Sequence, residues 1–280
     1  MTGEVPPAAA HGPLDRSPSG LELTDDAFLS GALQILQPRP GYRAGIDAVL
    51  LAAATELGDR SRVPVLDIGT GVGVAGLCLA RRCATAQVTL VERDPLLADL
   101  AARNIVRNGL HGRVHAVCAD ILGRAEELAA AGIRPHAFEV VIANPPWLEE
   151  GRGRAASDRI KARANAMPPG HLDRWIRFAA RVAVDDGTLL LIHRADALKC
   201  LLDVVDGRFG AIELLPIHPR RGVPANRILL RGRKGSRAPL VMQRGIVVHR
   251  PEGGYQLSIE AVLRHGAPLA WVGTGQPERV

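Results

Sequence analysis

The residues Asn144-Pro145-Pro146-Trp147 follow the apolar run Phe138–Ala143 and form the most specific chemical motif of the chain. The two prolines fix φ and stiffen the loop, and each residue before a proline is held in extended geometry. Asn144 offers a side-chain oxygen and Pro145 a carbonyl oxygen, and two such acceptors hold both hydrogens of a planar amino group. The nitrogen lone pair then points at an electrophilic methyl group, while Trp147 gives a base a flat face for stacking. The motif predicts methyl transfer to an exocyclic amino nitrogen, and its structural alternative is a stiff turn around a buried tryptophan.

A glycine-rich loop at residues 67–73 ends another apolar run, which begins at Val63. Glycines allow positive φ and let a ligand approach the backbone, and the amides that open the following helix attract an anionic group such as a carboxylate. Asp67, before the glycines, suits the ammonium group of an amino-acid-like cofactor better than a pyrophosphate. Glu92 ends the next strand-like run, where a carboxylate accepts the hydroxyl groups of a ribose.

The same loop matches a second pattern, G-x-G-x-x-G from Gly71 to Gly76, with Glu92 at about the expected distance. That pattern is typical of oxidoreductases that bind a dinucleotide. A tight turn without any ligand is a third interpretation. The acid before the glycines and the Asn-Pro-Pro-Trp motif favour methyl transfer, and the alternatives stay open at this point.

Asp120 follows a third strand-like run, residues 113–118. Its carboxylate is placed to accept the amino hydrogens of an adenine in the cofactor. The alternative is an N-cap for a helix that starts at Ile121, and the two roles are compatible.

Strand-like and helical runs alternate through the middle of the chain. Strands are expected at 63–68, 87–91, 113–118, 138–143 and 188–193, and helices at 95–108, 121–130, 172–184 and 195–205. This alternation predicts right-handed crossovers and a mostly parallel sheet with helices on both faces. The strand-like runs at 211–217, 227–230 and 246–249 have no helix between them and predict an antiparallel C-terminal edge.

The ends of the chain predict a tail and a helical segment. Residues 1–20 are rich in Pro, Ala, Gly and Ser and predict a disordered tail. Residues 26–36 and 46–57 predict two helices around a turn at 38–41. We therefore expect one domain over 21–280, made of an N-terminal helical segment (21–60) and a Rossmann-like core (61–250).

Composition narrows the class of protein. No apolar run approaches the ~20 residues that span a bilayer, and the N-terminus lacks the basic head and apolar core of a secretory signal. We therefore expect a cytoplasmic protein. A monomer is the favoured oligomeric state. Cys78, Cys83, Cys118 and Cys200 form no C-x-x-C pair. They predict buried free thiols without a disulfide, and no metal is expected.

The net charge is +6 at pH 7, and the basic residues cluster. No acidic residue lies between Glu213 and Glu252, and a second basic group occupies 152–163. Basic loops beside a base pocket suit phosphate contacts, whereas a solvated surface without a partner is the alternative. The residues expected to bind RNA are Arg220, Arg221, Arg231, Arg233, Lys234 and Arg237, of which 231–237 predict a hairpin tip.

These motifs together resemble those of class I S-adenosylmethionine-dependent methyltransferases that act on amino groups. Residues 41–52, Gly-Tyr-Arg-Ala-Gly-Ile-Asp-Ala-Val-Leu-Leu-Ala, resemble the bacterial tRNA1(Val) adenine N6-methyltransferases of the small-methyltransferase group. The resemblance extends from about Thr24 to about His249. It implies a Rossmann-like α/β fold, S-adenosylmethionine as cofactor, and tRNA as partner, with the adenine next to the anticodon as target.

The resemblance also implies roles for individual residues. Asn144, Pro145, Pro146 and Trp147 meet the target amine, although Tyr or Phe is more usual than Trp at the last position. Residues 42–47 cover the methionine end of the cofactor, or alternatively form a turn that leads into a helix. The cofactor-binding residues are Arg43, Asp47, Asp67, Gly69, Thr70, Gly71, Gly73, Glu92, Arg93, Asp120, Ile121 and Asn144.

Three rival functions remain. A protein-glutamine N5-methyltransferase also acts on a planar nitrogen, a nicotinamide-dependent oxidoreductase would use Gly71 to Gly76, and an RNA-binding protein would lack catalysis altogether. The basic residues argue against a protein-glutamine N5-methyltransferase. Intact Asn144 and Glu92 argue against an RNA-binding protein without catalysis. His193 is expected to be an ordinary histidine at the end of a strand.

Overall fold

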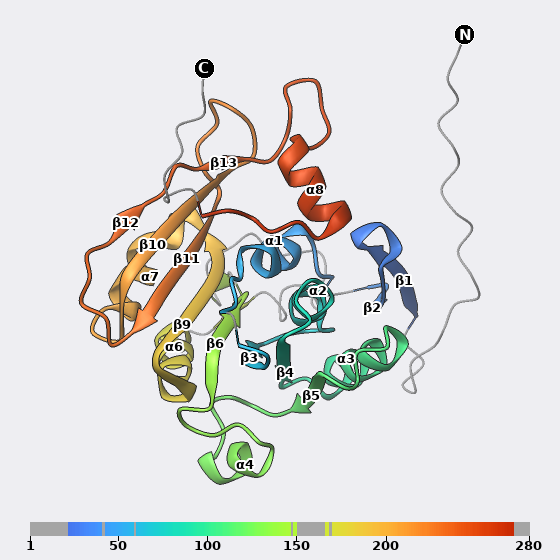
Figure 1. Cartoon of the computed structure of the whole chain (residues 1–280), viewed down its shortest axis with the longest axis vertical. Coiled ribbons are helices and arrows are strands. Elements are labelled where there is room, and N and C mark those ends of the chain that lie inside the picture. The colour runs from blue at the N-terminus through green and yellow to red at the C-terminus, as the bar shows by residue number, and fades with distance from the viewer. Residues whose placement is uncertain are drawn as a thin grey trace.

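The structure is a computed structural model that describes residues 22–40, 43–58, 60–146, 148–149, 166–167 and 170–271 (Figure 1). The predicted tail and Trp147 lie outside these residues. The described part contains a nine-stranded sheet. Its strands are β3 (Val63–Ile68), β4 (Ala86–Glu92), β5 (Val114–Cys118), β6 (Phe138–Ala143), β9 (Ala183–Arg194), β10 (Phe209–His218), β11 (Arg227–Lys234), β12 (Val241–Met242) and β13 (Ile246–Val247).

Helices flank this sheet. They are α1 (Ile46–Ala54), α2 (Val74–Arg82), α3 (Pro95–Arg107), α4 (Ala125–Ala130), α6 (His171–Val182), α7 (Leu198–Val205) and α8 (Leu257–His265). A short 3-10 helix, η2 (Ala195–Ala197), leads into α7, and two-residue strands β7 (Leu148–Glu149) and β8 (Ala166–Met167) pair with each other. No helix in the described ranges is long and apolar enough to cross a membrane.

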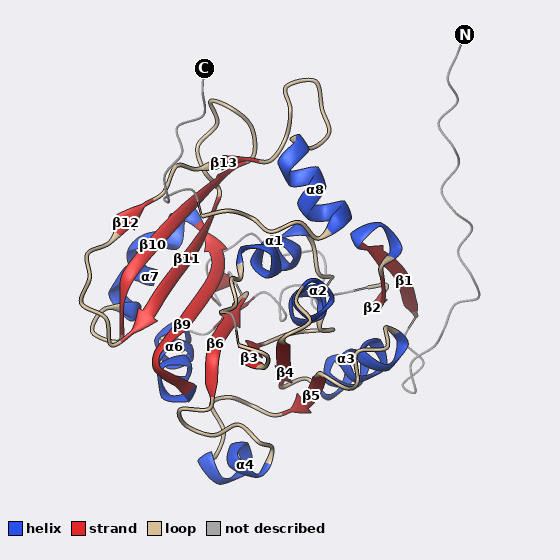
Figure 2. Ribbon diagram, viewed as in Figure 1, coloured by secondary structure: helices blue, strands red, loops and turns tan. Residues whose placement is uncertain are grey.

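The strand order β12-β10-β11-β9-β6-β3-β4-β5 combines two kinds of pairing (Figure 2). Strands β9, β6, β3, β4 and β5 are parallel, whereas β11 runs antiparallel to both β9 and β10. Side chains of β3 alternate between two cores: Val65 packs in the one that contains α1, α2 and α3, and Leu66 in the one that contains α6 and α7. Burial on both faces explains the nearly continuous apolar runs. The predicted fold class is confirmed.

The helix predicted for residues 26–36 is wrong. The chain there forms a β-hairpin of β1 (Leu23–Phe28) and β2 (Leu33–Pro38), with the 3-10 turn η1 (Leu29–Gly31) between them. The leucines of this segment repeat at helical spacing, but β2 is held by a distant helix. The side chain of Asn104 on α3 accepts a hydrogen bond from Leu36 N at 2.8 Å and donates one to Leu36 O at 3.1 Å. Such a long-range contact overrides local periodicity.

The C-terminal part departs from prediction in two ways. Strands β12 and β13 pair with β10 in parallel, not antiparallel. Strand β11 ends beside Phe209, the first residue of β10, and the chain then runs along the free edge of β10 in the same direction as β10. The fold also continues past residue 250: α8 packs beside α1 (Figure 1), and Trp271 donates a hydrogen bond to Ala54 O at 2.8 Å.

Two smaller predictions are also wrong. The helix expected at 121–130 begins only at Ala125, because residues 121–123 form a turn. Cys78 is buried as expected, but Cys118 and Cys200 are exposed. Cys118 ends β5, which is the edge strand of the sheet, so its local apolar pattern does not produce burial.

Candidate active site

A cavity of about 1200 Å³ opens at the carboxyl ends of the parallel strands. Its wall includes Gly69 and Gly71 after β3, Glu92 at the end of β4, Asp120 after β5 and Asn144 after β6. Open α/β sheets bind ligands at this edge, where the strand order reverses. The chemical motifs found along the sequence are therefore brought to one place.

The glycine loop has the backbone that only glycine adopts easily. Gly69, Gly71 and Gly73 have φ of 64°, 60° and 95°, values that favour glycine because a Cβ is strained there. Gly69 is also in close contact with Trp175 of α6, since a Cβ on Gly69 would lie 2.4 Å from Trp175 Cη2. The first glycine is needed both for the turn and for the approach of this ring.

Asp67 lies beneath the glycine loop instead of in the cavity wall. It is 2% exposed, and its Oδ2 accepts hydrogen bonds from Thr70 Oγ1 at 2.6 Å and from Gly76 N at 3.0 Å. Burial raises its pKa to about 7, although these hydrogen bonds oppose the shift. The geometry gives Asp67 the role of shaping the loop, and Thr70 and Gly73 likewise lie in the loop behind the cavity wall.

Glu92 faces the cavity and is fixed from two sides. Its Oε2 accepts a hydrogen bond from Gly71 N at 3.0 Å, and its Oε1 accepts one from Asp94 N at 2.9 Å. Asp94 in turn caps α3 by accepting from Leu96 N at 2.9 Å. Each carboxylate oxygen keeps further acceptor capacity, which fits a pair of ribose hydroxyls.

Asp120 lies on the same side of the cavity as Glu92, with Arg93 and Ile121 also in the wall. Its Oδ1 accepts a hydrogen bond from Leu122 N at 2.9 Å and so stabilises the turn after β5. The interpretation of Asp120 as a helix N-cap is wrong, because Arg124 is the residue before α4. The exposed carboxylate is available to a ligand.

The Asn-Pro-Pro segment leaves the sheet directly beside the glycine loop. Ala143 and Ile68, the last residues of β6 and β3, pair in the parallel ladder. Asn144 and Gly69, which follow them, therefore leave the sheet side by side. Asn144, Pro145 and Pro146 all line the cavity. Trp147 and the basic group at 152–163 lie outside the described residues.

Trp175 is a site residue that the sequence-based prediction missed. Together with His171, one helical turn earlier, it lines the cavity, and its ring lies against the glycine loop. Residues four apart lie on the same helix face, so the spacing of these two rings is a signal that could have found them, although the helix was predicted to begin only at residue 172. Trp175 lies against the glycine loop at Gly69, and it lines the same cavity as Pro145.

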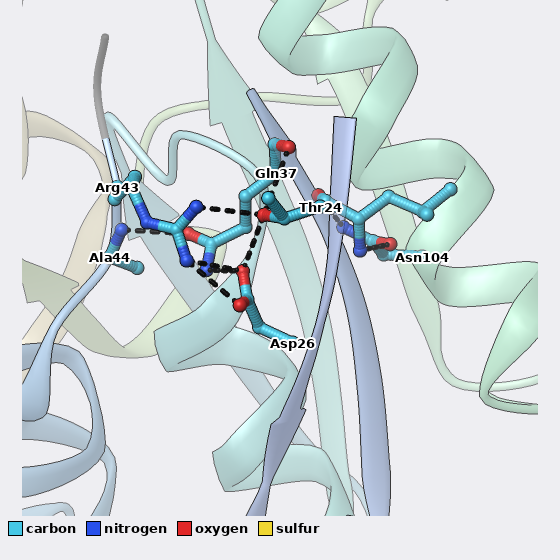
Figure 3. Close-up of polar contacts among 7 residues, drawn as sticks. Thr24, Asp26, Gln37, Arg43, Ala44 and Asn104 are labelled. Atoms are coloured by element: carbon cyan, nitrogen blue, oxygen red, sulfur yellow. Dashed lines mark hydrogen bonds and ion pairs between the residues drawn. The ribbon is translucent and has the colours of Figure 1, made fainter. Parts of the chain in front are cut away.

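The N-terminal hairpin holds another wall of the cavity (Figure 3). Arg43 pairs with Asp26 at 2.8 Å and donates to Thr24 Oγ1 at 2.8 Å. The backbone N–H of Ala44 donates to the buried side chain of Gln37 at 2.8 Å. This network fixes the stretch that leads into α1, and Arg43 lines the cavity.

Asp47, at the start of α1, links this wall to the antiparallel edge of the sheet. Its Oδ2 is 3.1 Å from Nε of Arg227, the first residue of β11, and both side chains line the cavity. Burial raises the pKa of Asp47, and the charge and hydrogen bond of Arg227 counteract part of this shift. Both predicted residues of the 42–47 segment, Arg43 and Asp47, are thus at the cavity.

The predicted RNA-binding residues separate into two groups. Arg220 and Arg221 are exposed on the loop between β10 and β11, whose Pro219 and Asn226 line the cavity. The other group comprises Arg231, Arg233, Lys234 and Arg237, and it lies toward the opposite end of β11, since Arg227 pairs with Arg194 but Arg233 with Thr188.

The second group is also largely neutralised. Arg231 pairs with Glu213 and Glu56, both at 2.6 Å, and lies 4.3 Å from the Trp271 ring. Arg233 pairs with Asp186. Among the described residues, no predicted RNA-binding residue lines the cavity itself, but the first group lies on a loop at its rim, residues 219–226, whose two ends do.

His193 is a buried histidine at the end of β9, and its Nδ1 has no hydrogen-bond partner in the described part of the chain. Burial lowers its pKa to about 4. Within the same described ranges, no group of three His, Cys, Asp or Glu side chains is arranged to hold a metal ion.

Comparison with known proteins decides the class of this site. The methyltransferase small domain family matches residues 45–172. A tRNA1(Val) (adenine(37)-N6)-methyltransferase of Porphyromonas gingivalis is 32% identical over 202 residues, which cover 69% of this chain and 77% of the relative. The protein belongs to the methyltransferase small domain family.

Further relatives agree with this assignment. An Aeromonas hydrophila protein of the same name is 30% identical over 78% of this chain and 86% of its own. A solved Agrobacterium tumefaciens structure described as a predicted O-methyltransferase has a TM-score of 0.66 and 30% identity, over 80% of this chain and 98% of its own. The small-domain methyltransferase described here uses S-adenosylmethionine, and its cavity residues fit that group: Glu92 offers acceptors for a ribose, and the glycine loop offers backbone amides for a carboxylate.

Proposed function

We propose that this methyltransferase modifies N6 of an adenine in tRNA and acts in the cytoplasm. The observation that carries the proposal is the register of β3 and β6, which sets Asn144 directly beside Gly69 of the cofactor loop. An amino group bound by Asn144 and the Pro145 carbonyl would lie next to a methyl donor bound along that loop. The names of the relatives from P. gingivalis and A. hydrophila agree with this target.

The chain's residues would act by positioning. S-adenosylmethionine supplies an electrophilic methyl group when it is bound. The Asn144 side-chain oxygen and the Pro145 carbonyl accept the two hydrogens of the amine and hold its lone pair in line with that methyl group. Glu92 and Asp120 would orient the cofactor's nucleoside, and Trp175, which lies against Gly69, would border the cofactor. Fixed dipoles thus position the amine for methyl transfer, and no strong base acts on it.

An RNA base is favoured over a glutamine side chain by charge and volume. The net charge is +6, and the exposed Arg220 and Arg221 stand at the rim of the cavity. Ligand cavities typically measure ~300–1000 Å³, so about 1200 Å³ leaves room for a nucleobase beside a cofactor. A glutamine amide would need far less space.

The test is transfer of labelled methyl from S-adenosylmethionine to total RNA and, in parallel, to total protein, with Asn144→Ala as the inactive control. We expect N6-methyladenosine in the tRNA fraction after nucleoside analysis. Label in protein alone would support the glutamine N5-methyltransferase instead. Label in neither fraction would contradict both substrates.

A further inference from the structure

One part of the cavity is not used by the groups assigned so far. It lies beyond Asn144 on the antiparallel side of the sheet, opposite to Glu92 and Asp120, and we name it the β10–β11 compartment. Its residues are Ile217, Pro219, Asn226, Arg227, Val248 and His249. Because the sheet order places β11 and β10 beyond β9 and β6, a ligand between Glu92 and Asn144 does not fill this part.

The compartment presents a flat aromatic surface that is already fixed in place. The ring of His249 stacks on Tyr255 with centroids 5.1 Å apart and an angle of 23° between planes. The backbone N–H of His249 donates to Pro219 O at 3.0 Å, and its Nδ1 lies 3.2 Å from Gly254 O. Half-buried His249 faces the cavity, with Tyr255 packed against the ring. A ring held in this way stacks a base with little loss of side-chain freedom.

The charges around the ring suit a phosphate. Arg227 enters the compartment with its guanidinium oriented by Asp47. Arg220 and Arg221 are exposed at the rim, and the described structure shows no acidic partner for either. The chain has no acidic residue from 214 to 251. Guanidinium groups beside an aromatic ring are a typical combination for a base with its phosphate.

We propose that the β10–β11 compartment binds the nucleotide that neighbours the target adenine, with its base against His249 and its phosphate toward Arg220 and Arg221. This inference rests on the proposed RNA substrate and deepens it, because it defines a second base-binding position. It gives the enzyme a means to select the sequence around the target, because the side chains that line the compartment would contact the neighbouring base.

The experiment measures binding of a fluorescein-labelled pentaribonucleotide, UUAUU, to the full chain by anisotropy. Loss of one stacked base weakens binding about 5- to 100-fold. We expect that loss for His249→Ala, whereas His249→Phe, which keeps a flat ring, binds within about threefold of the unaltered protein. His111→Ala is the matched control, because His111 lies in the exposed loop before β5, at the other edge of the sheet.

Two further measurements make the outcomes distinct. With total tRNA as substrate, His249→Ala should raise KM by a similar factor and leave kcat within about threefold, and its affinity for S-adenosylmethionine should be unchanged. Equal binding by His249→Ala and the unaltered protein, or equal losses for the Ala and Phe variants, would overturn the proposal. A parallel loss of cofactor affinity would assign the compartment to the cofactor. If one of these results is obtained while the unaltered protein methylates tRNA, only the proposal for the compartment is disproved. If the unaltered protein methylates no RNA, the proposed function itself fails.

Discussion

Glu92 at the end of β4 accepts a hydrogen bond from the backbone N–H of Gly71 at 3.0 Å. This bond joins β4 directly to the glycine loop that follows β3. The carboxylate is 9% exposed and lines the cavity. One side chain therefore shapes the loop and presents acceptors to the cavity.

Replacing this carboxylate should weaken cofactor binding. Each hydrogen bond to a charged group is worth about 1.5–3 kcal/mol, so Glu92→Ala should raise the Kd for S-adenosylmethionine about 10- to 100-fold in calorimetric titrations. Glu126→Ala is the control, because the Glu126 side chain is 77% exposed on α4. An unchanged Kd for Glu92→Ala would exclude Glu92 from the cofactor site.

Asn144 should matter for turnover and little for cofactor affinity. Removal of one preorganised polar group at a reacting centre lowers kcat by about 10²–10³, so we expect that loss for Asn144→Ala in methyl transfer to tRNA. The Kd for S-adenosylmethionine should stay within about threefold. A large rise in this Kd with little change in kcat would move Asn144 from the target amine to the cofactor.

Asp67 makes the stability of the protein depend on pH. Its pKa is raised from 3.8 to about 7 in the folded state, so the folded chain holds a proton there that the unfolded chain releases. The free energy of unfolding should therefore fall as the pH rises from about 4 to about 7, by at most ~4 kcal/mol at 1.36 kcal/mol per pH unit.

Asp67→Asn keeps an acceptor for Thr70 and Gly76 but cannot ionise. Urea denaturation at a series of pH values should show a flatter dependence for this variant between pH 4 and 7. Identical slopes for the two proteins would mean that Asp67 does not titrate in this range.

Trp175 should report cofactor binding. The chain has three tryptophans. Trp175 touches Gly69 of the glycine loop, whereas Trp271 packs against the end of α1. S-adenosylmethionine should change the intrinsic fluorescence of the unaltered protein and of Trp271→Phe, and the change should largely vanish in Trp175→Phe. Persistence of the full signal in Trp175→Phe would place the cofactor away from this ring.

RNA affinity should depend on the rim of the cavity more than on the far end of β11. Each phosphate contact contributes ~0.7–0.9 to the slope of log affinity against log salt concentration. Replacing Arg220 and Arg221 together by Glu should weaken tRNA binding and reduce this slope by roughly 1.4–1.8. Arg233→Gln, which removes a charge paired with Asp186, is the control. Equal effects of the two changes would contradict the placement of RNA at the rim.

The sequence by itself determined the class of fold and the main chemistry. Glu92, Asp120 and Asn144 each end or follow an apolar run, and the carboxyl ends of parallel strands meet at one edge of the sheet. Their proximity therefore followed from local patterns and a general rule of topology. The core strands were equally readable, because burial on both faces leaves a continuous apolar run.

Tertiary structure alone decided what depends on contacts between distant segments. Residues 26–36 have helical spacing but form a hairpin, because Asn104 hydrogen-bonds the backbone of β2 across 68 residues of sequence. Arg231 looks like an RNA ligand in sequence but is neutralised by Glu56, 175 residues away. Asp67 hydrogen-bonds within the glycine loop, and Trp175 lines the cavity from a helix more than a hundred residues later. No local pattern encodes these partners, since a side chain's role is set by the burial and charge that the whole fold brings to it.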